Sequence, residues 1–95
     1  MDRYWGKYRG VVLNNLDPMM LGRLCVSLER LGGADAVNWA LPCVPYAPAD
    51  AAFVLRPIGT AVWVEFEGGD LNYPIWTGRY WREGEGPILA DPAVP

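Results

Sequence analysis

Two glutamates in the second half of the chain are the residue pair best placed for catalysis. Glu65 and Glu67 alternate with apolar residues in the run from Ala61 to Glu67. A strand here would place both carboxylates on one face, about 6.5–7 Å apart. That separation is close to the range of an inverting glycosidase pair, so a small cell-wall hydrolase is one hypothesis. The same alternation is typical of a solvated strand face, and we favour this second interpretation.

The composition excludes most other catalytic and metal-binding chemistry. The sequence has no histidine, which excludes Ser-His-Asp and Cys-His arrangements and histidine-based zinc motifs. Two cysteines, Cys25 and Cys43, are too few for a metal site. We expect two free thiols, although spacing alone leaves a disulfide open. No glycine-rich stretch has the lysine and the strand–helix context of a phosphate loop. We therefore predict no catalytic residue, no cofactor and no metal.

A group of aromatic residues raises a second hypothesis, a module that binds single-stranded nucleic acid. Some β-sheet domains stack bases on aromatic rings beside a basic groove, and the rings here would be Trp63, Trp76, Tyr80 and Trp81. The chain has 8 Lys and Arg against 11 Asp and Glu, a formal net charge of −3. Because phosphate binding relies on Lys and Arg, this balance argues against a nucleic-acid partner.

Short strands must position these residues, and the patterns predict an all-β domain with five of them. Two expected strands flank the break at Gly68-Gly69-Asp70, where Asp70 can bond its own backbone two residues on. Pro74 suits the start of the strand after this break, and Gly78 predicts either a bulge within it or a place where another backbone comes close. Residues 38–46 are extended, but two prolines exclude a central strand throughout. The expected strands are residues 8–14, 23–28, 53–55, 61–67 and 75–81.

Two segments carry a resemblance to a known family. The first reads Asn-x-x-Asp-Pro-x-x-x-Gly-Arg over residues 14–23, with Asp17 able to cap a single helical turn. The second, over residues 57–78, reads Pro-x-Gly-x-x-Val-Trp-Val-x-Phe-Glu-Gly-Gly-Asp-x-x-x-Pro-Ile-Trp-x-Gly. Together they resemble the OB-fold domain of phage baseplate assembly protein V, shared with the Vgr-type spike proteins of type VI secretion. The resemblance covers about residues 4–81.

The resemblance implies a fold, a role and a set of partners. It implies a small five-stranded Greek-key OB-fold barrel over residues 1–81, and we read the Gly- and Pro-containing residues 82–95 as an extended tail. It also implies a structural, non-enzymatic adaptor between hub and tip in the central spike of a contractile phage tail or related injection system. In that setting the chain would be a homotrimer that meets hub, tube and spike-tip proteins.

Four exposed apolar residues are the expected partner contacts. Met19 and Met20 occupy a loop that should be polar, and Met adapts well to irregular binding surfaces. Trp5 and Trp81 lie at the two ends of the barrel sequence, beyond what so small a core encloses. Tyr4 and Trp5 are costly to leave in water, so we expect the first seven residues to pack against the barrel or a partner.

The sequence also bears on where the protein acts. No apolar run reaches the roughly 20 residues that span a bilayer, so we expect no stable membrane insertion. The sequence has no basic start followed by an apolar stretch, so we expect no signal peptide. We therefore expect synthesis in the bacterial cytoplasm and assembly into a tail baseplate or injection particle.

Overall fold

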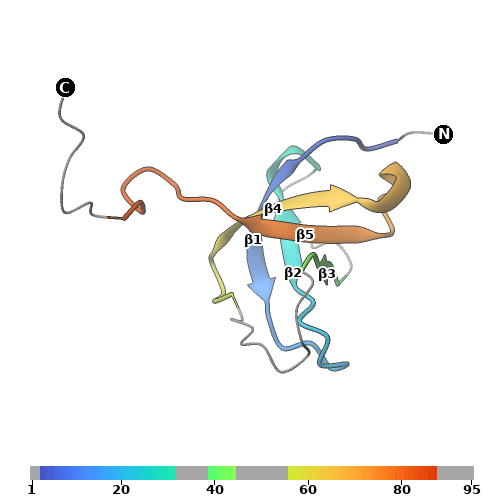
Figure 1. Ribbon diagram of the computed structural model, residues 1–95, viewed down its shortest axis with the longest axis horizontal. Coiled ribbons are helices and arrows are strands. Elements are labelled where there is room, and N and C mark those ends of the chain that lie inside the picture. The colour runs from blue at the N-terminus through green and yellow to red at the C-terminus, as the bar shows by residue number, and fades with distance from the viewer. Residues whose placement is uncertain (1–2, 32–38, 45–55, 88–95) are drawn as a thin grey trace.

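The computed structural model describes residues 3–31, 39–44 and 56–87. Over these ranges the chain is all-β, with one curled sheet of five strands (Figure 1). The strands are β1 (Tyr8–Asn14), β2 (Cys25–Leu28), β3 (Leu41–Pro42), β4 (Ala61–Phe66) and β5 (Pro74–Arg79). Two short 3-10 helices, η1 (Glu29–Leu31) and η2 (Glu67–Gly69), follow β2 and β4.

The strands lie in the order β2-β1-β4-β5-β3. β1 pairs antiparallel with both β2 and β4, β4 pairs antiparallel with β5, and β3 runs parallel to β5. One bridge then joins the two outer sides of this sheet. Leu24 N donates to Ala40 O at 3.0 Å, and Ala40 N donates to Leu24 O at 2.7 Å. The sheet therefore closes at this point, and the predicted small OB-fold barrel is confirmed.

The barrel interior is filled by the alternate side chains of its strands. Val62, Val64 and Phe66 of β4 are all buried, whereas Trp63 and Glu65 between them are partly exposed. The same alternation buries every second side chain of β2, and the side chain of the residue just before this strand is buried on the same side. The remaining members of this core cluster are Val12, Leu24, Val26, Leu28, Ala40 and Trp76. The period of two in the sequence thus gave the correct inward face.

The bulge predicted at Gly78 is present. Trp63 pairs with Gly78, but the next residue, Val64, pairs with Trp76, so Thr77 is the extra residue of β5. Gly78 has a φ of +148°, which side-chain-bearing residues rarely adopt. A Cβ at Gly78 would meet no atom within 4 Å, so the backbone conformation, and not a lack of space, favours glycine here.

The predicted limits of β2, β4 and β5 were wrong, and β2 begins at Cys25, not at Arg23. The third strand of the barrel is Leu41–Pro42, and the predicted strand at 53–55 lies outside the described residues. Pro42 is tolerated because the next residue supplies the ladder donor: Cys43 N donates to Trp76 O at 3.0 Å. β4 ends at Phe66, since Glu67 begins η2. β5 ends at Arg79, so Trp81 lies beyond it.

The turn after β4 also holds the N-terminal segment. Asp70 Oδ1 accepts from Asn72 N at 2.9 Å, the predicted bond two residues on. Tyr4 N donates to Gly69 O at 2.9 Å, and the Tyr4 ring packs on Tyr8 and Phe66. Tyr4 therefore packs against the barrel.

The chain after β5 leaves the sheet (Figure 1). Residues 82–87 are exposed, and Arg82 ties them back by donating to Gly59 O at 3.0 Å and pairing with Glu85 at 3.2 Å. The division into a barrel of residues 1–81 and a tail of residues 82–95 stays a prediction. Within the described part of the chain, no helix is long and apolar enough to cross a membrane.

Candidate partner-binding loop

The loop of residues 15–22 connects β1 to β2 and is built around Asp17. Met20 N donates to the Asp17 backbone carbonyl at 3.0 Å, which closes a single turn over Pro18 and Met19. Asp17 Oδ1 accepts from Met19 N at 2.9 Å, which confirms the predicted cap. Pro18 suits this position because its ring fixes φ and it has no N–H to satisfy.

The Asp17 carboxylate also binds the far end of the loop. Its Oδ2 accepts from Leu21 N at 2.9 Å and from Arg23 N at 3.1 Å. The Arg23 guanidinium adds two bonds, Nε to Oδ2 and Nη2 to Oδ1. The Asp17 side chain is only 3% exposed. The Arg23 hydrogen bonds, against the opposing effect of burial and with help from the backbone amides, hold the pKa of Asp17 well below its usual range.

Two further contacts anchor the loop to the barrel. The Arg23 guanidinium lies 5.7 Å from the centre of the Trp39 ring, a cation–π distance. Trp76 Nε1 donates to Gly22 O at 3.1 Å, and the Trp76 ring is itself in the core. The backbone of the loop is therefore fixed from its first turn to its exit.

The apolar side chains of this fixed loop point into solvent. The exposed fractions are Leu16 77%, Met19 63%, Met20 91% and Leu21 50%. Met20 has a φ of +55°, a left-handed conformation that costs a non-glycine residue about 1–2 kcal/mol. Leu16 and Leu21 were missed from the sequence, although both are apolar residues in the same short connection. The loop thus presents four apolar side chains on a rigid, locally strained backbone.

The other two predicted contacts lie elsewhere. Trp5 is 66% exposed, and its ring lies beside Gly69 of η2. Trp81 is 56% exposed and follows β5. In Figure 1 the loop of residues 15–22 is at the lower edge, whereas η2 and the N-terminal segment are at the upper right. Trp5 and Trp81 are exposed as predicted, but the four residues do not form one patch.

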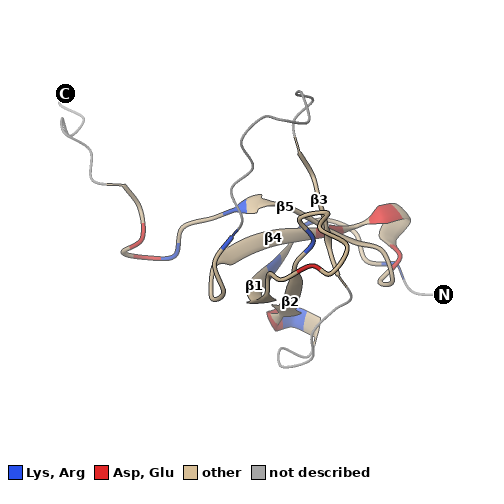
Figure 2. Ribbon diagram, turned by 90° about the horizontal axis from the view of Figure 1, so that it is seen from below, with Lys and Arg blue, Asp and Glu red and all other residues tan. Residues whose placement is uncertain are grey.

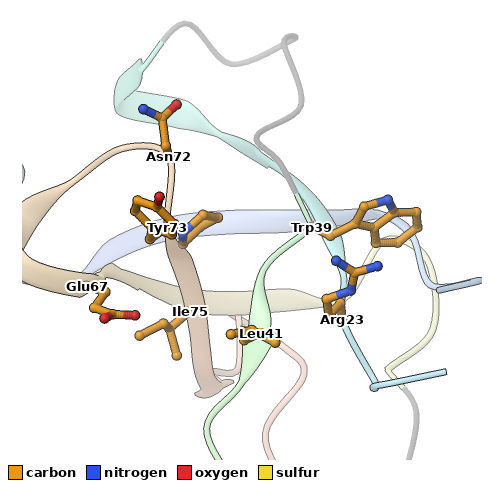
Figure 3. A pocket seen from close by; sticks show the side chains of 8 residues that line it. Arg23, Trp39, Leu41, Glu67, Asn72, Tyr73 and Ile75 are labelled. Carbon is orange, nitrogen blue, oxygen red and sulfur yellow. The ribbon is translucent and has the colours of Figure 1, made fainter. Parts of the chain in front are cut away.

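A hollow of about 380 Å³ opens between β3 and the start of β5 (Figure 3). Apolar side chains, including Leu41 and Ile75, form its floor, with Glu67 on one side and Arg23 and Trp39 on the other. Glu67 is the one carboxylate that lines it. The hollow can accept an apolar side chain, but it has no acid pair.

The structure separates Glu65 from Glu67. Glu65 lies on β4 and pairs with Lys7 at 2.7 Å, whereas Glu67 is in η2 and lines the hollow of Figure 3. The expectation that both lie on one strand was wrong, because the glycine turn begins one residue earlier. Both carboxylates remain open to solvent, in agreement with the solvated interpretation.

The aromatic platform of the second hypothesis is not assembled as expected. Trp76 is 4% exposed and belongs to the core, and Trp81 lies past the end of β5. Trp63 and Tyr80 do pack together, with ring centres 4.6 Å apart.

The cysteines are both free thiols. Cys25 is half-buried on β2 and Cys43 is exposed. Burial raises the pKa of the Cys25 thiol, against a smaller lowering by Arg23. Among the residues that the structure describes, no three His, Cys, Asp or Glu side chains are grouped to hold a metal ion.

The comparison with protein families identifies the barrel. Residues 8–81 match the family model of the type VI secretion system/phage-baseplate injector OB domain. The chain belongs to this family. The injector OB domain has a structural role in the baseplate, as part of an injection particle in which it associates with other tail or spike proteins. No curated protein matches the chain.

Proposed function

We propose that this injector OB domain is an adaptor between the hub and the tip of the central spike, and that it works as a homotrimer. In this role loop 15–22 is the principal contact with the partner chains, and Trp5 and Trp81 are secondary contacts. The protein performs no catalysis. It acts in the assembled tail baseplate or injection particle, after synthesis in the bacterial cytoplasm.

The observation that supports this function most directly is the fixed backbone of the loop. Its outward Leu and Met side chains would each contribute about 1.5–3 kcal/mol if a partner buried them fully. The Asp17 and Arg23 contacts fix the backbone before binding, so little conformational entropy remains to be lost. A rigid, exposed apolar loop is suited to permanent assembly and serves no purpose in an isolated domain.

The left-handed residue of the loop supports the same function. Met20 has the highest exposed fraction of the large apolar residues in the described part of the chain, at 91%. Its strained φ has no use in the free domain, where glycine would relieve it. Backbone strain of this kind is found at binding and active sites, where the surrounding contacts maintain it.

The test measures assembly by light scattering, for the chain alone and with its hub partner. We expect a trimer that is lost when Met19→Asp and Met20→Asp are combined. Leu71→Asp is the matched control, because Leu71 is 38% exposed in the turn after η2 and remote from the loop in sequence. A monomer under both conditions, or equal loss in the control, would contradict the proposal.

A second variant separates binding from folding. Met20→Gly should raise the free energy of unfolding of the isolated chain by up to about 1 kcal/mol, because glycine adopts the left-handed φ without strain. The same variant should weaken assembly, because it removes an exposed anchor. Assembly unchanged in this variant would show that the Met20 side chain is not a contact.

A further inference from the structure

A second surface of the barrel, on the outside of β1 and β4, gathers basic and aromatic side chains. Arg9 of β1 pairs with Trp63 of β4, and Trp63 packs on Tyr80. The Arg9 Cζ atom lies 5.5 Å from the centre of the Trp63 ring and 5.0 Å from that of Tyr80. We call these three residues the Arg9 stack. It is separate from loop 15–22.

A hollow lies on each side of the Arg9 stack. The first, of about 620 Å³, is lined by Lys7, Arg30 and Trp63 among others. The second, of about 460 Å³, is lined by Tyr80 and Arg82. Arg9 and Glu29 line both hollows. Figure 2 shows the basic positions on β1 and just after β2, where η1 begins.

The charge of this surface is opposite to that of the chain. The whole sequence has a net charge of −3, yet four of its eight basic side chains line these two hollows with a single carboxylate, Glu29. Lys7 and Arg82 already pair with Glu65 and Glu85. Within the described residues, no carboxylate is bonded to Arg9 or Arg30, and both are exposed.

The stacking of Arg9 leaves its hydrogen-bonding edge available. A guanidinium that lies over aromatic rings keeps its N–H donors in its own plane, where they match a carboxylate at two points. The rings also limit the motion of the side chain, which lowers the entropy lost on binding.

The geometry points to a docking site for an acidic segment of a partner protein. Such a segment would place one carboxylate in each hollow, between Arg9 and Arg30 on one side and between Arg9 and Arg82 on the other. Its chain would cross the Arg9 stack. Single-stranded nucleic acid fits less well, because Trp63 and Tyr80 use their faces on each other and on Arg9. Glu29 would also repel a continuous run of phosphates.

The experiment titrates a fluorescein-labelled oligoglutamate peptide into the whole chain at low salt and follows fluorescence anisotropy. We expect saturable binding that weakens as salt is added. Arg9→Ala and Arg30→Ala should each lower the affinity about tenfold. Arg9→Lys should lower it by a smaller factor, because it keeps the charge but loses the planar donor edge. The Met19→Asp and Met20→Asp changes should have no effect, so this test is independent of the contact proposed for loop 15–22.

The matched control is Arg79→Ala, which removes the same charge from an exposed residue of β5 that lines neither hollow. Equal losses in Arg79→Ala and Arg9→Ala would overturn the proposal, since binding would then follow total charge. Oligothymidylate bound more tightly than the peptide at the same salt would overturn it in favour of nucleic acid. No peptide binding at all would also overturn it. If Arg9→Ala fails to fold, Arg30→Ala on exposed η1 decides the outcome.

Discussion

Arg23 meets the Asp17 carboxylate at two points, Nε to Oδ2 at 3.0 Å and Nη2 to Oδ1 at 2.8 Å. Three backbone amides donate to the same carboxylate, so Asp17 organises the whole β1–β2 connection. Asp17→Asn keeps the shape of the side chain but loses its negative charge. The amide group cannot accept every hydrogen bond that the carboxylate accepts. We expect a lower free energy of unfolding and a mobile loop, measured by urea denaturation and by NMR of the Met19 and Leu21 amides. Asp70→Asn is the control and should have the smaller effect, because Asp70 accepts one such amide bond and the Asn carbonyl oxygen can still accept it.

The pKa of Asp17 predicts how stability depends on acid. Because the folded-state pKa lies below the ordinary value of about 3.9, the folded chain binds the proton less readily than the unfolded chain. The stabilisation is therefore complete at neutral pH and declines as the pH falls below about 4 towards the folded-state pKa. The stability difference between the natural chain and Asp17→Asn should shrink between neutral pH and about pH 3. A difference that stays constant over this range would show that the charge is not the cause.

Two adjacent glycines in the turn after β4 should respond differently to alanine. Both have positive φ, +59° at Gly68 and +76° at Gly69, so each change costs about 1–2 kcal/mol in backbone strain. A Cβ at Gly68 would meet no atom within 4 Å, whereas one at Gly69 would lie 3.1 Å from Cζ2 of Trp5. Gly69→Ala should therefore be more destabilising than Gly68→Ala, by about 1 kcal/mol. Removing the ring with Trp5→Ala should abolish much of this difference. Chemical denaturation of the two glycine variants, each with and without Trp5→Ala, provides the measurement.

The two thiols should differ in reactivity. Burial raises the pKa of Cys25, so less thiolate is present at neutral pH, and the side chain is also less accessible. Cys43 is exposed, and a disulfide-exchange reagent should modify it first. Rates measured on Cys25→Ser and Cys43→Ser test this order, and unfolding in urea should bring the two rates together. Faster reaction at Cys25 in the folded chain would contradict the packing of β2.

The separated carboxylates should be dispensable. Glu65→Gln removes a Lys7 ion pair whose two side chains are 54% and 41% exposed, which costs at most about 1 kcal/mol. Glu67→Gln changes one wall of an open hollow. The double variant should fold and assemble as the natural chain does, and neither protein should clear peptidoglycan. Clearing by the natural chain that vanishes in the double variant would restore the hydrolase hypothesis.

The sequence predicted those parts of the fold that depend on local pattern. Val62, Val64 and Phe66 alternate with exposed residues, so their inward face followed from strand geometry alone. Gly78 indicated the bulge because a glycine inside a strand pattern often marks one. The two-residue strand Leu41–Pro42 was missed because it is too short to show a period, and only its pairing with β5 makes it a strand.

Of the candidate loop, the sequence pointed to Met19 and Met20, but not to Leu16, Leu21 or the contacts that hold the backbone. Met19 and Met20 stood out as apolar residues in a connection that should be polar. The role of Arg23 was missed, because a side-chain pair six residues apart across a loop follows neither helical nor strand spacing. The Arg9 stack was missed because it depends on the register of β1 against β4, which the sequence does not show.

The barrel is closed by the fewest backbone hydrogen bonds at the bridge between Leu24 and Ala40, which we call the seam. The described pairing on this side is one bridge, whereas β1, β4 and β5 pair along their lengths. Fluctuations that stop short of global unfolding should begin here, so the amides of Leu24 and Ala40 should exchange with deuterium sooner than those of β4. Arg23 is the residue between this seam and loop 15–22. A partner that binds the loop would therefore also slow opening of the seam, and assembly would make the barrel more rigid than any single copy of it.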